Sequence, residues 1–119
     1  MIGVVIPVRN GWEDTRECLK SLYNQDYKIE VVLVDTGSFD DTLSCFSEFP
    51  GISKIGAFGC NFSQAVNTGC DFLFRFKDIE RVLILNNDTA VVKGALFFMD
   101  DTFDYYDKVG IVTPRIHYY

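Results

Sequence analysis

The stretch Val82-Leu83-Ile84-Leu85-Asn86-Asn87-Asp88-Thr89, or VLILNNDT, runs from four apolar residues directly into a polar cluster with a single carboxylate. A short, continuous apolar run that ends in polar residues is typical of a strand covered on both faces of a sheet. Similar runs occur at Ile2 to Ile6, at Val31 to Val34 and at Val109 to Val112, with a weaker one at Ile52 to Ile55. These runs predict a sheet of buried strands.

Segments with the apolar spacing of helices lie between these runs. A helix from Trp12 to Asn24 is expected to bury one face, formed by Thr15, Cys18, Leu19 and Leu22. A second helix, from Asn61 to Phe76, carries one stripe formed by Phe62, Val66, Gly69, Leu73 and Phe76. Shorter helices are expected over Asp41 to Phe49 and Lys93 to Phe103. Strands that alternate with helices predict an α/β fold, Rossmann-like, with a mainly parallel, doubly wound sheet and helices on both faces.

The composition is that of a globular domain. The chain has 119 residues, of which 48% are hydrophobic, and its formal net charge is -6. Residues 1-119 therefore fit one domain, and the acidic charge disfavours nucleic acid as a partner. The apolar runs are too short for a transmembrane segment, and the N-terminus lacks a signal-peptide pattern.

The four cysteines, at positions 18, 45, 60 and 70, form no CxxC pair and have no histidine close by. This spacing argues against a zinc site and favours reduced cysteines that pack as small apolar residues. Reduced cysteines in turn favour a cytoplasmic location. The inner face of the membrane is an alternative location.

Three of the apolar runs end in polar clusters, at Pro7 to Asn10, Asp35 to Ser38 and Asn86 to Asp88. Each cluster alone is compatible with an ordinary turn or helix cap. In open α/β sheets, however, ligands bind beyond the carboxyl ends of the strands, where all three clusters would meet. Asp35 is suited to accept a hydrogen bond from a base N–H or a ribose hydroxyl, and Gly37 would let a ligand approach the backbone.

Asp88 is the one carboxylate in the cluster that opened this section. It is a hard oxygen ligand of the kind that Mg²⁺ or Mn²⁺ uses together with substrate phosphates. A bound cation would also allow an acidic chain to accept a diphosphate. The alternative is that Asp88 is a solvated loop residue.

Four segments, in the order VVIPVRN, VVLVDTGSFDDT, NFSQAVNTG and LILNNDT, resemble the successive motifs of the family 2 glycosyltransferases. Members of that family have the GT-A fold and use nucleotide-diphospho-sugars as donors. The resemblance covers nearly the whole chain. Within the family, the LNNDT form is most similar to the rhamnosyltransferase-like members.

The strand-end residues and the resemblance together indicate a nucleotide pocket formed by Pro7, Val8, Asn10, Asp35, Gly37, Asn61, Asn67 and Asn87. The resemblance implies that Asp35 contacts the base and that Asp88 is the metal-binding carboxylate of a DxD-type motif. For Asn61, a helix N-cap is an equally supported alternative. Two positions depart from the family pattern. Thr36 stands where many members have a second Asp, and Asn86 stands at the first Asp of the motif, so the site carries less negative charge.

The resemblance implies an inverting glycosyltransferase of polysaccharide biosynthesis. It would transfer a sugar from a UDP- or dTDP-linked donor to a saccharide or other hydroxyl acceptor. In the family, the general base lies beyond the DxD-type motif, in the acceptor-binding half. This chain is therefore expected to be a truncated domain that supplies the donor-binding part, with no catalytic residue assigned and no sugar transfer of its own. The aspartates that follow have the dense spacing of a solvated face, at Asp100, Asp101, Asp104 and Asp107.

Other features lead to weaker expectations. The exposed apolar surface of a truncated domain would allow self-association. The aromatic residues near the C-terminus are expected in a core or an interface, namely Phe97, Phe98, Phe103, Tyr105 and Tyr106. The alternatives to a glycosyltransferase are a non-catalytic nucleotide-binding or interaction module of the same fold, and a nucleotidyltransferase. The latter would carry a glycine-rich basic loop after the first strand, where only Arg9 is present.

Overall fold

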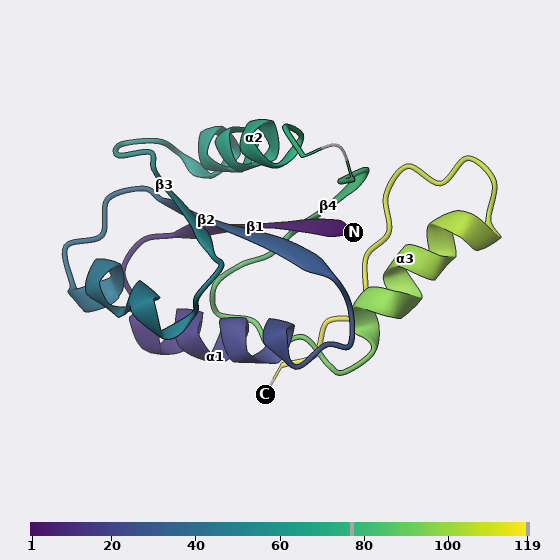
Figure 1. The fold of residues 1–119 in the computed structure, drawn as a ribbon, viewed down its shortest axis with the longest axis horizontal. Helices are drawn as coiled ribbons and strands as arrows, with labels where there is room; N and C mark the ends of the chain where they lie inside the picture. Colours follow the sequence, from purple (N-terminus) through teal and green to yellow (C-terminus); the bar gives the residue numbers. More distant parts are fainter. Residues whose placement is uncertain (77, 119) are drawn as a thin grey trace.

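The computed structural model describes residues 1–76 and 78–118, without the side chains at positions 43 and 45. The elements are β1 (Ile2–Val8), α1 (Trp12–Tyr23), β2 (Ile29–Asp35), the 3₁₀ helix η1 (Asp41–Glu48), β3 (Ser53–Gly56), α2 (Phe62–Leu73), β4 (Arg81–Ile84) and α3 (Ala95–Tyr105). The strand order is β3-β2-β1-β4, and every pair is parallel. Helix α2 covers one face of the sheet and α1 the other (Figure 1). The predicted α/β fold with a doubly wound parallel sheet is confirmed.

Helix α1 follows the sequence prediction closely. Its buried residues are the four that were expected, Thr15, Cys18, Leu19 and Leu22. Glu13 and Asp14 lie in the first turn, where the helix dipole favours negative charge. The buried face packs with Ile2, Val4, Ile6 and Val8 of β1 in the larger of two apolar clusters. This cluster and the one under α2 place the core on both faces of the sheet.

Helix α2 begins at a capping box. The Asn61 side chain accepts a hydrogen bond from the Gln64 backbone N–H, and the Gln64 side chain accepts one from the Asn61 N–H. Its buried residues include Val66, Gly69 and Leu73, as the spacing predicted. Phe62 and Phe76 are exposed, which corrects the expected stripe. The helix ends at Leu73, so Phe76 lies beyond it, while Phe62 is the first helical residue, at the edge of the sheet.

Gly69 is the point of closest approach between α2 and the sheet. A methyl group at this position would lie 2.5 Å from Cγ1 of Val5 and 3.2 Å from Cγ2 of Val34. Interiors packed this tightly do not accept an extra methyl group without displacement of their neighbours. The contact therefore depends on the absence of a side chain at Gly69.

We expect the Gly69→Ala substitution to lower the free energy of unfolding by about 1–2 kcal/mol. Overpacking costs roughly 1–3 kcal/mol, and the better helix propensity of alanine returns up to about 1 kcal/mol. Urea unfolding measures the difference, and Asp71→Ala, at an exposed position of the same helix, serves as the control. A Gly69→Ala variant as stable as the wild-type chain would show that Val5 moves aside at no cost.

Strand β4 is less buried than its apolar sequence predicted. It is the edge strand of the sheet, paired with β1 alone among the described residues, and Ile84 is 50% exposed. The strand predicted over Val109 to Val112 is wrong, because these residues belong to no strand. They line a cavity beside β4 instead of pairing with it. An apolar run specifies burial only where the fold supplies a neighbour to cover it.

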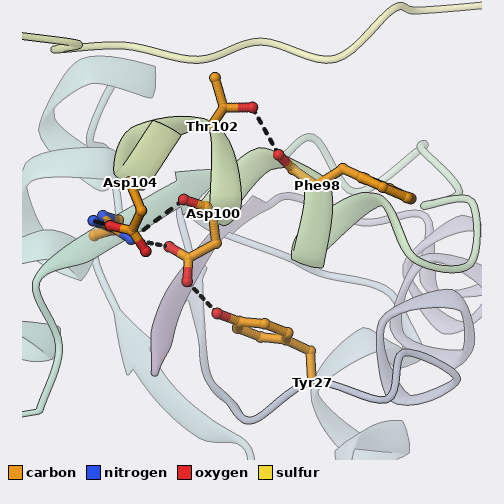
Figure 2. A network of polar contacts seen from close by, with 6 residues as sticks. Tyr27, Phe98, Asp100, Thr102 and Asp104 are labelled. Atoms are coloured by element: carbon orange, nitrogen blue, oxygen red, sulfur yellow. Dashed lines mark hydrogen bonds and ion pairs between the residues drawn. The ribbon is translucent and has the colours of Figure 1, made fainter. Parts of the chain in front are cut away.

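Helix α3 is held at the amino end of the sheet by a polar network (Figure 2). The Tyr27 hydroxyl donates to Asp100, and the Arg81 guanidinium reaches Asp100 Oδ1 at 2.6 Å and Asp104 Oδ1 at 2.7 Å. The hydrogen bond to Asp100 raises the pKa of Tyr27 to about 12. Asp101, Asp104 and the aspartate at 107 are exposed as predicted, whereas Asp100 is half-buried and is part of this network.

We expect Tyr27→Phe to lower the free energy of unfolding by about 1–2 kcal/mol at neutral pH, as for a hydrogen bond to a charged group. The pKa of Tyr27 is raised above its usual value of 10.0, so its stabilising effect is complete below about pH 10 and is lost as the pH rises towards 12. Urea unfolding across this range should show a steeper alkaline loss in the wild-type chain than in the variant. Parallel pH profiles would contradict the role of the hydroxyl. Tyr105→Phe, at an exposed position, is the control.

The remaining expectations have mixed outcomes. Phe97, Phe98, Tyr105 and Tyr106 are exposed, so they are not core residues of this chain, while Phe103 is half-buried with its ring under Arg81.

Cys18, Cys60 and Cys70 are free thiols, as predicted, and the side chain at position 45 lies outside the description. Among the described residues, every helix is too short or too polar to cross a bilayer.

Candidate functional site

The carboxyl ends of the strands meet at one edge of the sheet. Val8 of β1 is in register with Asp35 of β2, and Asp35 is in register with Gly56 of β3. The backbone N–H of Leu85 donates to the carbonyl of Val5 at 3.0 Å, which continues the pairing of β4 past its last strand residue. The polar clusters that follow β1, β2 and β4 are therefore brought together, as the sequence predicted.

Asp35 is the buried carboxylate of this edge, with only 1% of its surface exposed. Its Oδ1 accepts hydrogen bonds from the backbone N–H groups of Ser38, at 2.9 Å, and Gly37, at 3.3 Å. Its Oδ2 is buried and has no hydrogen-bond partner among the described residues. Buried carboxylate oxygens almost always have a partner, so the described part of the chain leaves this acceptor without a donor.

The loops after β1 and β2 are tied together by Asn10. Its backbone N–H donates to Ser38 Oγ at 2.8 Å, and its side-chain Oδ1 accepts from the Phe39 N–H at 2.9 Å. Asn10 has a φ of 58°, a left-handed conformation that asparagine tolerates. Beside it, the Gly11 N–H donates to Asp40 Oδ2 at 2.9 Å. The contacts place Asn10 at the predicted edge and give it a structural role, while its contact with a nucleotide stays a prediction.

Asp40 was missed by the sequence reasoning, and Ser38 was named only as part of the cluster after the second apolar run, without its contact to Asn10. Asp40 also caps η1 by accepting hydrogen bonds from the Thr42 N–H and hydroxyl. These hydrogen bonds, with that from Gly11, hold the pKa of the exposed Asp40 carboxyl below its usual range. The signal for the cap was present in the sequence Asp40-Asp41-Thr42, but the contact with Gly11 requires the fold.

Of the other predicted pocket residues, Pro7, Val8 and Gly37 lie at the strand ends, whereas Asn61 and Asn67 belong to α2 and its cap. Val8 is buried and its carbonyl accepts a hydrogen bond from the Thr36 N–H at 2.9 Å, and Pro7 beside it is half-buried. Gly37 has a φ of 131°, which a residue with a side chain rarely adopts. Asn61 is the N-cap of α2, which was the alternative interpretation of this residue from the sequence. Asn67 is exposed on the same helix.

The turn after β4 rests on α1. Asn87 Nδ2 donates to Thr15 Oγ1 at 3.0 Å, so this side chain points towards α1, and its nucleotide contact stays a prediction. The Cys18 thiol donates to the Asn86 carbonyl at 3.7 Å, beneath the turn. Burial raises the pKa of Cys18 to about 11, so the thiol remains protonated at neutral pH. Asp88 is exposed at the tip of the turn.

The residues near Asp88 offer a limited set of metal ligands. No group of three or more His, Cys, Asp or Glu side chains suited to a metal occurs among residues 1–76 and 78–118. The neighbouring Asn86 and Asp88 supply an amide and a carboxylate, which are oxygen donors of the type that Mg²⁺ and Mn²⁺ prefer. The protonated Cys18 does not compete as a thiolate. These residues fit a cation that takes most of its ligands from a diphosphate and water.

A cavity of about 620 Å³ lies elsewhere, between β4, α3 and residues 108–112. Its lining includes Arg81, Ile84, Met99 and Ile111. The cavity is alongside the edge strand and towards the amino ends of the strands, on the far side from Asp35. Arg81 and Asp100 of its lining belong to the network that holds α3, and its described lining includes none of the polar residues of the strand-end site.

Comparisons with known proteins bear on the fold and the family of the chain. S. aureus TarS residues 1–349 is 22% identical with a TM-score of 0.71, over 96% of this chain and 38% of that one. Its complex with UDP is similar, at 22% identity and a TM-score of 0.72 over 94% and 38%. The mannosyltransferase PcManGT from Pyrobaculum calidifontis, in complex with GDP-Man and Mn²⁺, is 27% identical with a TM-score of 0.61, over 75% and 28%. The chain thus spans less than half the length of these proteins.

These likenesses establish the predicted Rossmann-like GT-A fold. No curated protein matches the chain. The match to the family described as Glycosyl transferase family 2 covers residues 3–116. The chain therefore belongs to glycosyl transferase family 2, as its four ordered motifs predicted.

Proposed function

We propose that this chain binds the nucleoside diphosphate of a sugar donor at the carboxyl edge of its sheet. The observation that carries the proposal is Asp35, whose Oδ2 is buried and unpartnered while its Oδ1 is occupied by two backbone N–H groups. Solved proteins with the same fold are complexes with UDP and with GDP-Man and Mn²⁺. A base N–H is the donor that would satisfy Asp35.

Asp35 Oδ2 is a single acceptor without a partner among the described residues, and a single acceptor favours uracil or thymine as the base. Each presents one imino N–H between two carbonyl groups, which matches one acceptor. Guanine presents an imino N–H and an adjacent amino group, and these pair best with two carboxylate oxygens. In Asp35 the second oxygen is already used by Gly37 and Ser38. We therefore propose a UDP- or dTDP-linked donor.

Asp88, with Asn86 beside it, is proposed to hold Mg²⁺ or Mn²⁺ against the diphosphate. A cation would offset the negative charge of the diphosphate in a chain whose net charge is -6. Because Asp88 supplies a single carboxylate ligand, the affinity for metal alone should be weak and should increase when the diphosphate is bound.

The complete reaction is proposed to be an inverting transfer of the sugar to a saccharide or other hydroxyl acceptor. This chain would supply the donor-binding part, because it spans 38% of one solved relative and 28% of another. The same proposal includes the rhamnosyltransferase-like subtype, a place in polysaccharide biosynthesis and a cytoplasmic location. Exposed apolar residues near the C-terminal end, such as Ile111 and Ile116, support the prediction of self-association, which light scattering tests.

Isothermal titration calorimetry with UDP, dTDP and GDP tests the donor site. We expect UDP or dTDP to bind more tightly than GDP, and saturating Mn²⁺ to strengthen binding relative to EDTA. Absence of binding by all three nucleotides at saturating metal would refute the proposed site. A non-catalytic nucleotide-binding module would give the same titrations, so consumption of the nucleotide-sugar by the full-length protein with acceptors distinguishes it from a transferase.

A further inference from the structure

Phe58 is an exposed aromatic residue beside the turn that donates hydrogen bonds to Asp35. Its side chain is 68% exposed and belongs to neither apolar cluster. A methyl group built on Gly56 would lie 3.2 Å from Cε2 of Phe58, and one built on Gly37 would lie 3.9 Å from Cδ1. The ring therefore lies against two glycines, one in register with Asp35 and the other in the turn that donates to it.

The backbone around Phe58 fixes the ring at this place. The Ala57 N–H donates to the Asp35 carbonyl at 2.7 Å, and the Gly59 N–H donates to the Thr36 carbonyl at 3.2 Å. Phe58 is thus held between two hydrogen bonds to the end of β2. Gly59 has a φ of 77°, which allows the chain to turn directly after the ring.

Exposure alone does not distinguish Phe58, because Phe39 and Phe74 are also exposed; its place against the turn that binds Asp35 does. Exposure of a phenylalanine forgoes the stabilisation that its burial would give. A nucleobase, in contrast, needs two features: an acceptor for its edge N–H and a flat apolar surface for its face. Asp35 Oδ2 is the first, and the face of Phe58 is suited to be the second, because every base can stack on an aromatic ring.

We propose that Phe58 is the stacking surface for the nucleobase whose N–H is accepted by Asp35. This inference rests on the proposed donor site and adds a residue to it. The two contacts have different consequences. Asp35 selects a base by its hydrogen-bonding edge, whereas Phe58 contributes affinity for any base placed there and none for a diphosphate without a base.

The test compares Phe58→Ala, Phe58→Leu and Phe58→Trp with the wild-type chain. Calorimetry with UDP should show affinity lowered by roughly 5- to 20-fold in Phe58→Ala, within the range for loss of one base–aromatic stack, and largely retained in Phe58→Trp. Pyrophosphate with Mn²⁺ should bind all variants equally. Phe74→Ala is the matched control, because Phe74 is 57% exposed at the opposite end of α2.

A second readout reports stacking directly. The uracil H5 and H6 resonances of UDP should move upfield on binding to the wild-type chain, through the ring current of Phe58. Phe58→Leu keeps an apolar side chain without a π face and should lose this shift. If the wild-type chain binds UDP but Phe58→Ala and Phe58→Leu keep its affinity and its uracil shifts, the stacking role is wrong and the donor site stands. If the wild-type chain binds no nucleotide, both proposals fail.

Discussion

Replacing Asp35 with alanine is expected to weaken UDP binding by about 1–3 kcal/mol, both with Mn²⁺ and with EDTA. The substitution removes a buried acceptor at the strand ends that has no hydrogen-bond partner among the described residues, and it leaves the base N–H without an acceptor in a dry site. Calorimetry gives the loss under each condition. Because the contact is to the base and not to the diphosphate, the loss should be the same with and without metal.

Asp35→Asn sharpens this test because it preserves the size of the side chain. Its amide oxygen can still accept hydrogen bonds from Gly37 and Ser38, which places an NH₂ donor where Oδ2 was. The variant should bind UDP more weakly and should improve CDP relative to UDP, since cytosine presents an acceptor where uracil presents a donor. An unchanged order of the two nucleotides would contradict the assignment of the base to Asp35. Asp71→Asn, at an exposed position on α2, is the control.

The second large effect is expected at Asp88. Asp88→Ala should remove most of the gain in UDP affinity that Mn²⁺ provides, while it leaves the affinity in EDTA close to that of the wild-type chain. Loss of a residue that merely supports a metal ligand lowers metal affinity by roughly 10- to 100-fold, so removal of a carboxylate ligand should have at least that effect. Calorimetry at saturating and zero metal separates the two contributions.

Asp101→Ala is a suitable control for Asp88, because it removes an exposed carboxylate from α3 and changes the net charge by the same amount. A similar loss in this variant would show that the effect is one of overall charge. Equal, metal-independent losses in Asp35→Ala and Asp88→Ala would contradict the division of roles between the base and the metal.

The helices on the two faces of the sheet were predictable because their apolar residues repeat at helical spacing. In α1 all four predicted residues are buried. The spacing did not show where each helix stops, so Phe62 and Phe76 were assigned to a buried stripe although they lie at or beyond the ends of α2. Periodicity identifies the face of a helix, whereas its ends depend on caps and on the size of the surface it covers.

The edge of the sheet was not predictable from apolar runs alone. The run at Val82 to Leu85 forms the exposed edge strand, and that at Val109 to Val112 forms no strand. Both runs are as apolar as the central strand β2, whose last five residues are buried. Strand order depends on long-range pairing, and a residue pattern within one segment does not contain it.

The sequence predicted which strand ends form the candidate site, but it did not predict the contacts between the residues there. Sequence position placed Asp35 and Asp88 at one edge. The turn through Gly37 and Ser38 determines that Asp35 Oδ1 accepts two hydrogen bonds while Oδ2 has no partner among the described residues. The ring of Phe58 next to this turn depends on the pairing of β3 with β2. Contacts between separate loops are set by the fold, so no local motif reveals them.

A ¹H–¹⁵N NMR titration of the chain with UDP and Mn²⁺ tests the central claim most directly. We predict that UDP shifts the amide signals of Gly37 and Ser38, which donate to Asp35, and that Mn²⁺ added to the complex broadens the signals from Asn86 to Thr89 first. Signals from the cavity beside β4, such as those of Ile111 and Val112, should not change. Shifts confined to that cavity, or broadening centred on the aspartates of α3, would contradict a donor site at the carboxyl edge of the sheet.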